Sequence, residues 1–257
     1  MQNNYVGDVG DFVKYGLLNF IAGKNNLILG INWYFCLATK RKNKSDGKRS
    51  RDGKYTDYLK PNNRWASGLQ ACSPTLYHQM HEIVLEKKYR KIKGIEEGSV
   101  LPKRTIFYGE LLRNDRIPSQ QKASIRNSWH LAALNALKRA DIVFLDPDNG
   151  IETPKMSSFH RISSKHVSFE EISDYYNKRG QSVIIYNHKS HQEESIYQQR
   201  FRKLRGLTAT IYILRAHRGT ARDFVFLLQP KHKKLMENAI SGFMKSGWKE
   251  HFNRVKY

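Results

Sequence analysis

The chain has only two cysteines, Cys36 and Cys72, in 257 residues. Two cysteines are too few for a disulfide framework or for a zinc site built on cysteine, so we expect reduced thiols. Long apolar runs are also lacking, because stretches such as IVFL at 142–145 fall far short of the roughly 20 residues of a membrane span. The opening MQNNYVGDVGD lacks the charged-then-apolar pattern of a signal peptide. We therefore predict a cytoplasmic protein without a membrane segment.

Acidic residues are scarce relative to basic ones. The 23 Asp and Glu face 45 Lys and Arg, which gives a formal net charge of +22 at pH 7. A small domain needs a net charge of only about 2–8 to stay in solution. The excess favours a polyanionic partner, because phosphates neutralised by Lys and Arg release their counterions and so add affinity. We therefore predict DNA or RNA as the partner, with plain solubility as the alternative explanation.

Apolar segments alternate between two periodicities along the chain. Helical spacing is expected at 12–22, 74–91, 128–139, 169–178, 191–205 and 231–245, and buried strands at 27–35, 105–111, 140–145, 182–186, 208–215 and 223–228. Continuous apolar strands that alternate with helices predict a mostly parallel sheet with helices on both faces. The last two strands, joined by HRGTAR, predict an antiparallel C-terminal pair. We expect a single Rossmann-like α/β domain with a basic loop insertion at about 38–64.

Basic residues are concentrated in that loop and in the last hairpin turn. As nucleic-acid contacts we predict Lys40, Arg41, Lys42, Lys48, Arg49, Arg51, Arg218 and Arg222. Arginine suits phosphate because its guanidinium can donate two parallel hydrogen bonds to it. For the hairpin arginines, a solvated turn in a basic protein explains the pattern about as well.

The most specific pattern is the acidic turn after the strand 140–145. That strand runs directly into Asp146-Pro147-Asp148-Asn149-Gly150. Ligand sites of open α/β sheets lie beyond the carboxyl ends of the strands, so we predict Asp146 and Asp148 as catalytic residues. Asp146 could accept a hydrogen bond from a substrate amine, or both carboxylates could hold Mg²⁺ together with Glu110 or Glu152. An ordinary turn is the alternative, since Asp-Pro and Asn-Gly are common turn dipeptides.

Two further groups lie at expected strand or helix ends. His188 follows the strand 182–186, where it could act as a catalytic acid or base or bind phosphate. Asp8, Asp11 and Lys14 lie at the beginning of the first helix, where they could contact a ligand. Helix capping is the alternative for the aspartates, and it explains one of them better than two.

The segment GDVGDFVKYGLL and the later strand that ends in Asp-Pro resemble the adenine-amine methyltransferases of large-subunit ribosomal RNA. That family carries an N-terminal segment similar to His-Ala-Asp-Val-Leu-Lys-His and an Asp-Pro-Pro-Tyr motif. Asp11 and Lys14 match the former, and Asp146 and Pro147 match the first half of the latter. The resemblance implies a methyltransferase-like fold and S-adenosylmethionine as cofactor. The patterns GDxGDFxKYGLL and FLDPDNG are also similar to those of uncharacterised bacterial proteins.

The chain departs from that family at two places. Asp148 and Asn149 replace the second Pro and the aromatic residue of the motif. The first strand runs into Asn32-Trp33-Tyr34-Phe35-Cys36, without the glycine-rich turn through which methyltransferases approach their cofactor. If S-adenosylmethionine binds, we expect Asn32 to lie beside it.

The sequence is therefore compatible with three functions. The first is a nucleic-acid methyltransferase in which Asp146 orients the target amine and Asp11 and Lys14 lie on the cofactor side. The second is a Mg²⁺-dependent nuclease with metal ligands Asp146, Asp148 and Glu110, His188 as base, and Arg218 or Arg222 on the phosphate. The third is a non-catalytic nucleic-acid binder, whose affinity would fall with salt whether or not Asp146 is present.

Overall fold

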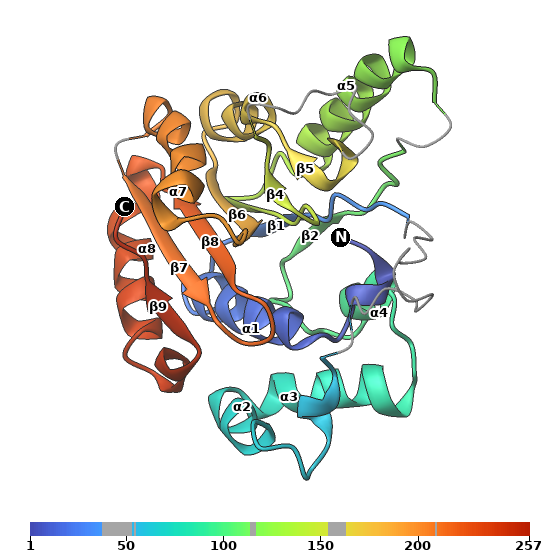
Figure 1. Ribbon diagram of the computed structural model, residues 1–257, viewed down its shortest axis with the longest axis vertical. Coiled ribbons are helices and arrows are strands. Elements are labelled where there is room, and N and C mark those ends of the chain that lie inside the picture. Colours follow the sequence, from blue (N-terminus) through green and yellow to red (C-terminus); the bar gives the residue numbers. More distant parts are fainter. Residues whose placement is uncertain (38–52, 54, 114–116, 154–162, 209) are drawn as a thin grey trace.

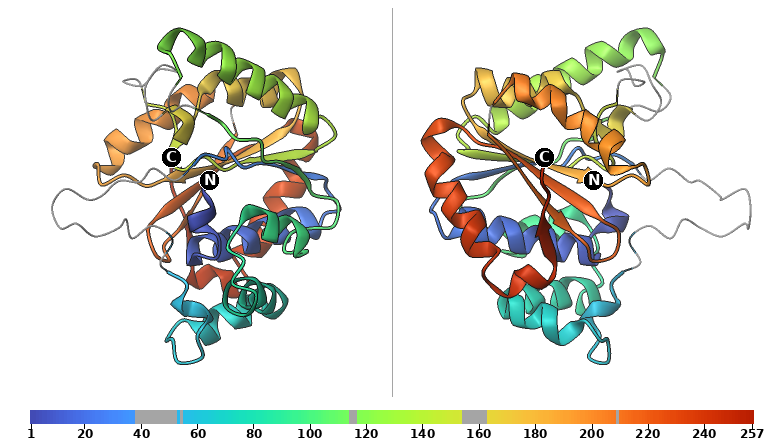
Figure 2. Two further views of the ribbon diagram at one scale, coloured as in Figure 1. Left: turned by 90° about the vertical axis from the view of Figure 1, so that its right-hand side faces the viewer. Right: turned by 60° about the vertical axis from the view of Figure 1, so that its left-hand side comes forward.

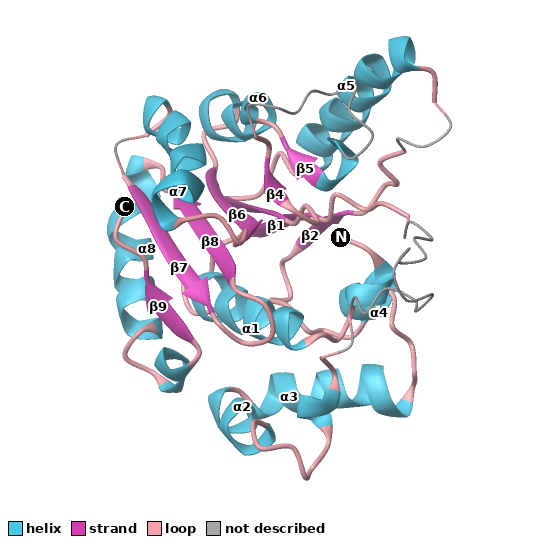
Figure 3. Cartoon of the chain, viewed as in Figure 1, coloured by secondary structure: helices cyan, strands magenta, loops and turns pink. Residues whose placement is uncertain are grey.

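The computed structural model describes residues 1–37, 53, 55–113, 117–153, 163–208 and 210–257 (Figures 1 and 3). Its helices are α1 (Val9–Leu18), α2 (Ala66–Cys72), α3 (Pro74–His81), α4 (Ile92–Glu97), α5 (Ser119–Ala136), α6 (Phe169–Ser173), α7 (Glu194–Arg202) and α8 (Pro230–Phe243). Its strands are β1 (Leu29–Asn32), β2 (Ile106–Tyr108), β3 (Ile142–Leu145), β4 (Gly150–Ile151), β5 (His166–Val167), β6 (Ser182–His188), β7 (Ile211–Ala216), β8 (Arg222–Leu227) and β9 (Phe252–Arg254).

Within those residues, seven strands form one mixed sheet. Their order is β2-β1-β3-β6-β8-β7-β9, and β4 pairs with β5 in a separate small sheet. The neighbours β2, β1, β3 and β6 are parallel, whereas β8 runs antiparallel to both β6 and β7. The α/β class, the parallel centre and the antiparallel C-terminal pair are therefore confirmed.

Helices cover both faces of this sheet (Figure 2). One layer contains α1 to α4 and α8, and the other contains α5, α6 and α7. Alternation along β3 supplies both cores: Ile142 and Phe144 pack in the cluster of the α1 layer, and Val143 and Leu145 in the cluster of the α5 layer. A strand that is apolar on both faces is therefore required here, as its sequence indicates.

The first helix begins three residues earlier than its periodicity predicts. The Asp8 side chain accepts a hydrogen bond from the Gly10 amide at 2.8 Å, so it caps the helix as the structural alternative expected. All ten residues of α1 are buried, and a π-helical segment at Asn19–Gly23 continues it. Asp8 therefore has a structural role, whereas the buried Asp11 and Lys14 lie about one and two turns further along the helix.

Several elements differ from the sequence-based expectation. Helix α5 begins at Ser119 rather than near 128, and α2, α4, β4, β5 and β9 were not anticipated. These missed elements have two to seven residues, which is too short for a reliable periodicity. The loop residues Lys40, Arg41, Lys42, Lys48, Arg49 and Arg51 lie outside the described residues. Where the chain is described, no helix has the length and apolar character needed to span a bilayer.

Candidate functional site

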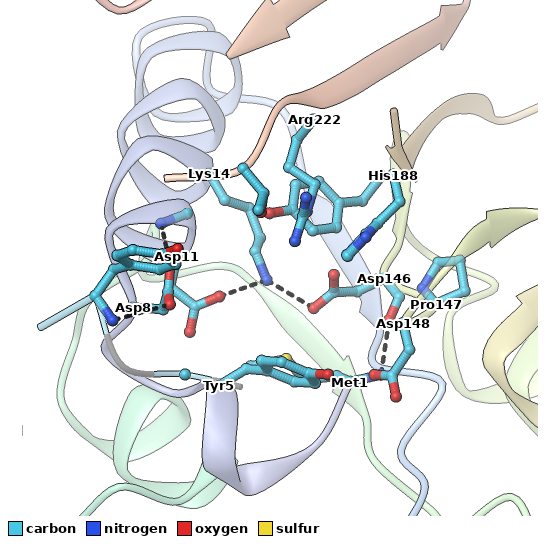
Figure 4. Close-up of a pocket in the computed structure, with 15 residues that line it drawn as sticks. Met1, Tyr5, Asp8, Asp11, Lys14, Asp146, Pro147, Asp148, His188 and Arg222 are labelled. Carbon is cyan, nitrogen blue, oxygen red and sulfur yellow. Dashed lines mark hydrogen bonds and ion pairs between the residues drawn. The ribbon is translucent and has the colours of Figure 1, made fainter. Parts of the chain in front are cut away.

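A cavity of about 240 Å³ opens beyond the carboxyl ends of β3 and β6 (Figure 4). The beginning of α1 and the beginning of β8 form its other walls. Residues that line it include Tyr5, Asp8, Asp11, Lys14, Tyr55, Asp146, Pro147, Asp148, Tyr186, His188, Thr220 and Arg222. The acidic turn after β3, the pair Asp11 and Lys14, and His188 are thus brought together, in the place where open α/β sheets hold their ligands.

Lys14 lies between two carboxylates at the base of this cavity. Its Nζ is 2.8 Å from Asp11 Oδ1 and 2.8 Å from Asp146 Oδ2, and the three side chains are at most 4% exposed. Asp11 precedes Lys14 by one helical turn, whereas Asp146 comes from the end of β3. The ammonium also lies 4.8 Å from the centre of the Tyr186 ring, a cation–π contact. We call Asp11, Lys14 and Asp146 the buried triad.

Burial and the neighbouring charges raise the pKa values of both Lys14 and Asp11. Burial acts to lower the pKa of Lys14, but Asp11 and Asp146 outweigh it and raise that pKa well above its usual value. Lys14 therefore stays an ammonium and is no nucleophile. Burial raises the pKa of Asp11 to about 6, although Lys14 opposes the shift. Because one carboxylate is in excess, the triad can take up a proton near neutral pH.

Asp148 is engaged in structural contacts. Its Oδ1 lies 2.9 Å from the Met1 ammonium, Gln2 donates a hydrogen bond to Oδ2, and Lys165 Nζ is 3.5 Å from Oδ2. Burial alone would raise the pKa of Asp148, but the Met1 ammonium, Gln2 and Lys165 lower it to about 2. The carboxylate is therefore charged and already surrounded by donors, so Asp148 holds this turn in place.

The opposite wall is made by His188 and Arg222, which pair across β6 and β8 and face the triad (Figure 4). Burial first, and then Arg222, lower the pKa of His188 to about 3, so the imidazole is neutral at pH 7. The Arg222 Nη1 donates to the Ala221 carbonyl at 3.1 Å, while its buried Nε has no hydrogen-bond partner. No carboxylate in the described residues forms an ion pair with Arg222. This wall is suited to bind an anion.

Asn32 does not reach the cavity. It is fully buried, its Nδ2 donates to the Tyr175 hydroxyl at 3.1 Å, and its Oδ1 accepts from the Tyr34 amide. Strand register explains this: Asn32 pairs with Leu145, whose side chain belongs to the α5 layer, whereas Asp146 follows one residue later on the α1 side. The side chain of Asn32, which we expect beside S-adenosylmethionine if that cofactor binds, is therefore turned away from this cavity, and its role in cofactor binding stays a prediction.

The predicted magnesium ligands are not brought together. Glu110 is exposed beyond β2 and is not among the residues that line the cavity, while Asp146 and Asp148 are paired with ammonium groups. In the described part of the chain, no group of three or more His, Cys, Asp or Glu residues is placed to hold a metal ion. The set Asp146, Asp148 and Glu110 therefore does not form a metal site in this structure.

The structure also separates the two hairpin arginines. Arg222 lines the cavity described above, whereas Arg218 lines a second one beside α2. Sequence reasoning missed Tyr186 and Tyr55 as lining residues. Tyr186 could have been found, because the two-residue period of a strand puts it on the same face as His188. Tyr55 gave no such signal, since it lies within the expected basic loop 38–64, which has no strand or helix periodicity.

The cavity thus combines a buried acidic side with a cationic side. Asp146 Oδ2 accepts from Lys14, and no hydrogen bond to its Oδ1 is found among the described residues. That oxygen can accept a hydrogen bond from an amine or hydroxyl of a ligand, while Arg222 meets an anionic group of the same ligand. The chain matches no protein-family model, and a search of curated proteins finds no match either.

Proposed function

We propose that the chain is an enzyme of methyltransferase-like fold that acts on DNA or RNA and takes one nucleotide unit in the cavity beyond β3 and β6. The sheet supports this proposal, because it is parallel in its centre and carries the antiparallel pair β7 and β8 near one edge. The resemblance of the Asp146-Pro147 turn to a methyltransferase motif points to the same fold. The net charge of +22 favours a polyanion as substrate.

The observation that carries the proposal is the position of Asp146 opposite Arg222. A nucleotide offers both a hydrogen-bond donor on its base and an anionic phosphate. Asp146 Oδ1 would accept from the base amine, and Arg222 would bind the phosphate (Figure 4). Neutral His188 would add a hydrogen bond without adding charge.

The buried triad supplies a route for a proton. Removing a proton from an amine or hydroxyl needs a base whose pKa is close to the working pH. Asp11 has a pKa of about 6, and Lys14 connects it to Asp146 through two 2.8 Å contacts. Asp146 would orient the reacting group, and the triad would accept the proton that this group releases.

S-adenosylmethionine, which the resemblance implies, does not fit the turn after β1. The polar atoms of Asn32 are used by Tyr175 and Tyr34. Tyr34 adopts φ +45°, a conformation that favours glycine. Its fully buried ring lies in the turn where a methyltransferase would have glycine residues. Its hydroxyl donates to Glu171 at 3.1 Å, which fixes the ring there. The proton-transfer role assigned to the triad above therefore does not depend on a cofactor at that turn.

The nuclease alternative and the non-catalytic alternative remain distinct proposals. A nuclease would need Mg²⁺ held by Asp146 and another carboxylate, which the pairing with Lys14 opposes. A non-catalytic binder would not need a lysine and two carboxylates buried in one cavity, an arrangement that is costly and typical of functional sites. A cytoplasmic location follows from the sequence and stays a prediction.

Binding is tested by fluorescence anisotropy with labelled DNA and RNA over a range of salt. We expect affinity to fall steeply from about 50 to 200 mM salt, as phosphate contacts require. Absence of binding at low salt would overturn the proposal. Titration calorimetry with millimolar S-adenosylmethionine, and incubation of nucleic acid with Mg²⁺, distinguish methyl transfer and cleavage.

The variant Asp146→Asn keeps the shape of the turn but removes the acceptor charge. We expect it to keep salt-dependent binding through its phosphate contacts, more weakly because the contact to the base amine is altered, and to lose modification of that nucleic acid as followed by mass spectrometry. Asp57→Asn is the matched control, because Asp57 is 64% exposed and pairs only with Lys60 among the described residues. Equal activity of both variants would contradict the role of Asp146.

A further inference from the structure

A second cavity, of about 340 Å³, lies between α2, the turn Gly247–Glu250 and the turn that joins β7 to β8. Its lining includes Arg64, Trp65, Cys72, Arg218, Glu250 and His251. The exposed Gly68 also borders it, and a side chain there would meet nothing within 4 Å. The cavity is therefore open at α2, and neither the buried triad nor the proposed chemistry uses it.

Trp65 is the aromatic residue of this cavity. The other three tryptophans, Trp33, Trp129 and Trp248, are buried in the two cores, whereas Trp65 is partly exposed. Its ring has the Arg64 guanidinium 4.8 Å and the Arg218 guanidinium 5.8 Å from its centre. A partly exposed indole beside two guanidiniums is a surface on which a flat aromatic ligand can stack.

The two arginines keep their positive charge available. Arg218 donates from Nε to His251 Nδ1 at 2.7 Å and from Nη2 to the Glu250 carbonyl at 2.9 Å, both uncharged acceptors. Burial first, and then Arg218, lower the pKa of His251 to about 4, so this histidine is neutral at pH 7. No carboxylate of the described residues forms an ion pair with Arg64 or Arg218. The cavity therefore attracts anions next to its aromatic surface.

The turn between β7 and β8 connects this cavity to the first one. Arg218 lines the second cavity, and Thr220 and Arg222 line the first. The four residue-to-residue steps from Arg218 to Arg222 span at most about 14 Å. Gly219, at φ +71°, lets the turn pack against the beginning of α1, where a side chain would meet Val9 at 3.1 Å. Tyr55, which is half exposed, lies beside the same glycine.

We infer that the second cavity is a stacking subsite for single-stranded nucleic acid. A base of the strand packs on Trp65, Arg64 and Arg218 bind the flanking phosphates, and a neighbouring nucleotide of the same strand enters the Asp146 cavity. Stacking on an aromatic side chain needs an unpaired base, so this subsite selects a single strand or a loop over a duplex. The inference rests on the proposed function and deepens it, because it names the form of the substrate.

The test uses the intrinsic fluorescence of Trp65. Since the other tryptophans are buried, a single-stranded oligonucleotide that stacks at this subsite should quench emission from Trp65. We expect quenching by single-stranded DNA or RNA, weaker quenching by a duplex of the same sequence, and none in Trp65→Phe. Quenching that persists unchanged in Trp65→Phe would overturn the inference.

A second measurement compares affinities. Removal of one stacking platform costs about 1–3 kcal/mol, so Trp65→Ala should weaken single-strand binding roughly tenfold. Trp65→Phe should retain most of the affinity. Leu131→Ala is the control, because Leu131 is an exposed apolar residue on α5 in the opposite layer. Thermal unfolding of each variant shows whether the fold is kept.

The outcomes separate the two proposals. If the unaltered chain binds no nucleic acid at low salt, both fail together. If it binds with a normal salt dependence but Trp65→Ala binds equally well, only the stacking subsite fails. If Trp65→Ala lowers affinity for single strands and for duplexes by the same factor, stacking on an unpaired base is likewise contradicted.

Discussion

Lys14 and Asp146 are 132 positions apart in the sequence, yet the ammonium of one lies 2.8 Å from the carboxylate of the other. The contact joins the first helix to the end of the central strand β3, below a cavity that neither element forms alone. Because both side chains are almost fully buried, each offsets part of the cost of burying the other. Stability and ligand binding are therefore coupled at this pair.

Lys14→Met tests that coupling. The substitution leaves Asp11 and Asp146 buried without their shared cation, and breaking such a contact costs about 3–5 kcal/mol. We expect a loss of that size in the free energy of unfolding, measured by urea denaturation. Lys60→Met is the control, since Lys60 and Asp57 form an exposed pair that should contribute at most about 1 kcal/mol. Equal losses in the two variants would show that the triad is not an electrostatic unit.

The pKa of His188 predicts how stability depends on pH. In the folded chain this pKa is about 3, and in the unfolded chain it is about 6.5. Between these values the unfolded state binds a proton that the folded state does not, so the free energy of unfolding falls as pH falls. The slope from this group approaches about 1.4 kcal/mol per pH unit.

His188→Gln should remove that slope. Asp11 acts in the opposite direction. Because its pKa is raised in the folded chain, its contribution to the free energy of unfolding is lost as pH rises from 3.8 to about 6. Asp11 is present in the unaltered chain and in His188→Gln, so its contribution cancels when the unfolding free energy of one is subtracted from that of the other. We expect the difference between the unaltered chain and the variant to grow from pH 4 to about 6.5 and then stay constant. Parallel curves would contradict a neutral His188.

Arg222→Ala should weaken binding by a similar factor for nucleic acids of any base sequence. If Arg222 contacts one phosphate, the slope of log affinity against log salt should become smaller by about 1. Lys178→Ala is the control, because Lys178 is 70% exposed and follows α6 on the other side of the sheet. An unchanged salt slope in Arg222→Ala would place the phosphate elsewhere.

Much of the fold could be predicted from the sequence, because it depends on local patterns. The apolar strands 140–145 and 182–186 are continuous, so a buried parallel pair follows from composition alone, and β3 and β6 are that pair. The position of Asp146 also follows, since it comes directly after β3. The short β9 could not be predicted, because three residues of which two are exposed show no pattern.

The site could be predicted only in part, because its contacts are tertiary. Sequence reasoning found Asp11, Lys14, Asp146 and His188, but not that a lysine neutralises the carboxylate proposed to hold a metal. It placed Asn32 at the end of a strand, but not on the far face of the sheet. The face of the sheet on which a side chain lies follows from strand register, and register depends on pairing between segments distant in sequence.

Gly150→Ala is expected to be the most disruptive single change in the turn after β3. Gly150 has φ +104°, a conformation that residues with a side chain rarely adopt. An added Cβ would lie 2.0 Å from Asn187 Oδ1 and 2.8 Å from its Cα, so backbone as well as side chain would have to move. The Asn187 Oδ1 also accepts the Ile151 amide at 2.8 Å, and this hydrogen bond would be lost.

Strain of this kind costs about 1–3 kcal/mol, and the lost buried hydrogen bond adds about 1–3 kcal/mol. We expect the melting temperature of Gly150→Ala to fall by several degrees, measured by circular dichroism. Gly180→Ala is the matched control, because Gly180 also has positive φ, at +62°, but a side chain there meets nothing within 4 Å. If both variants lose the same stability, backbone conformation alone explains the effect; a larger loss at Gly150 shows that Asn187 holds the Asp146 turn against β6.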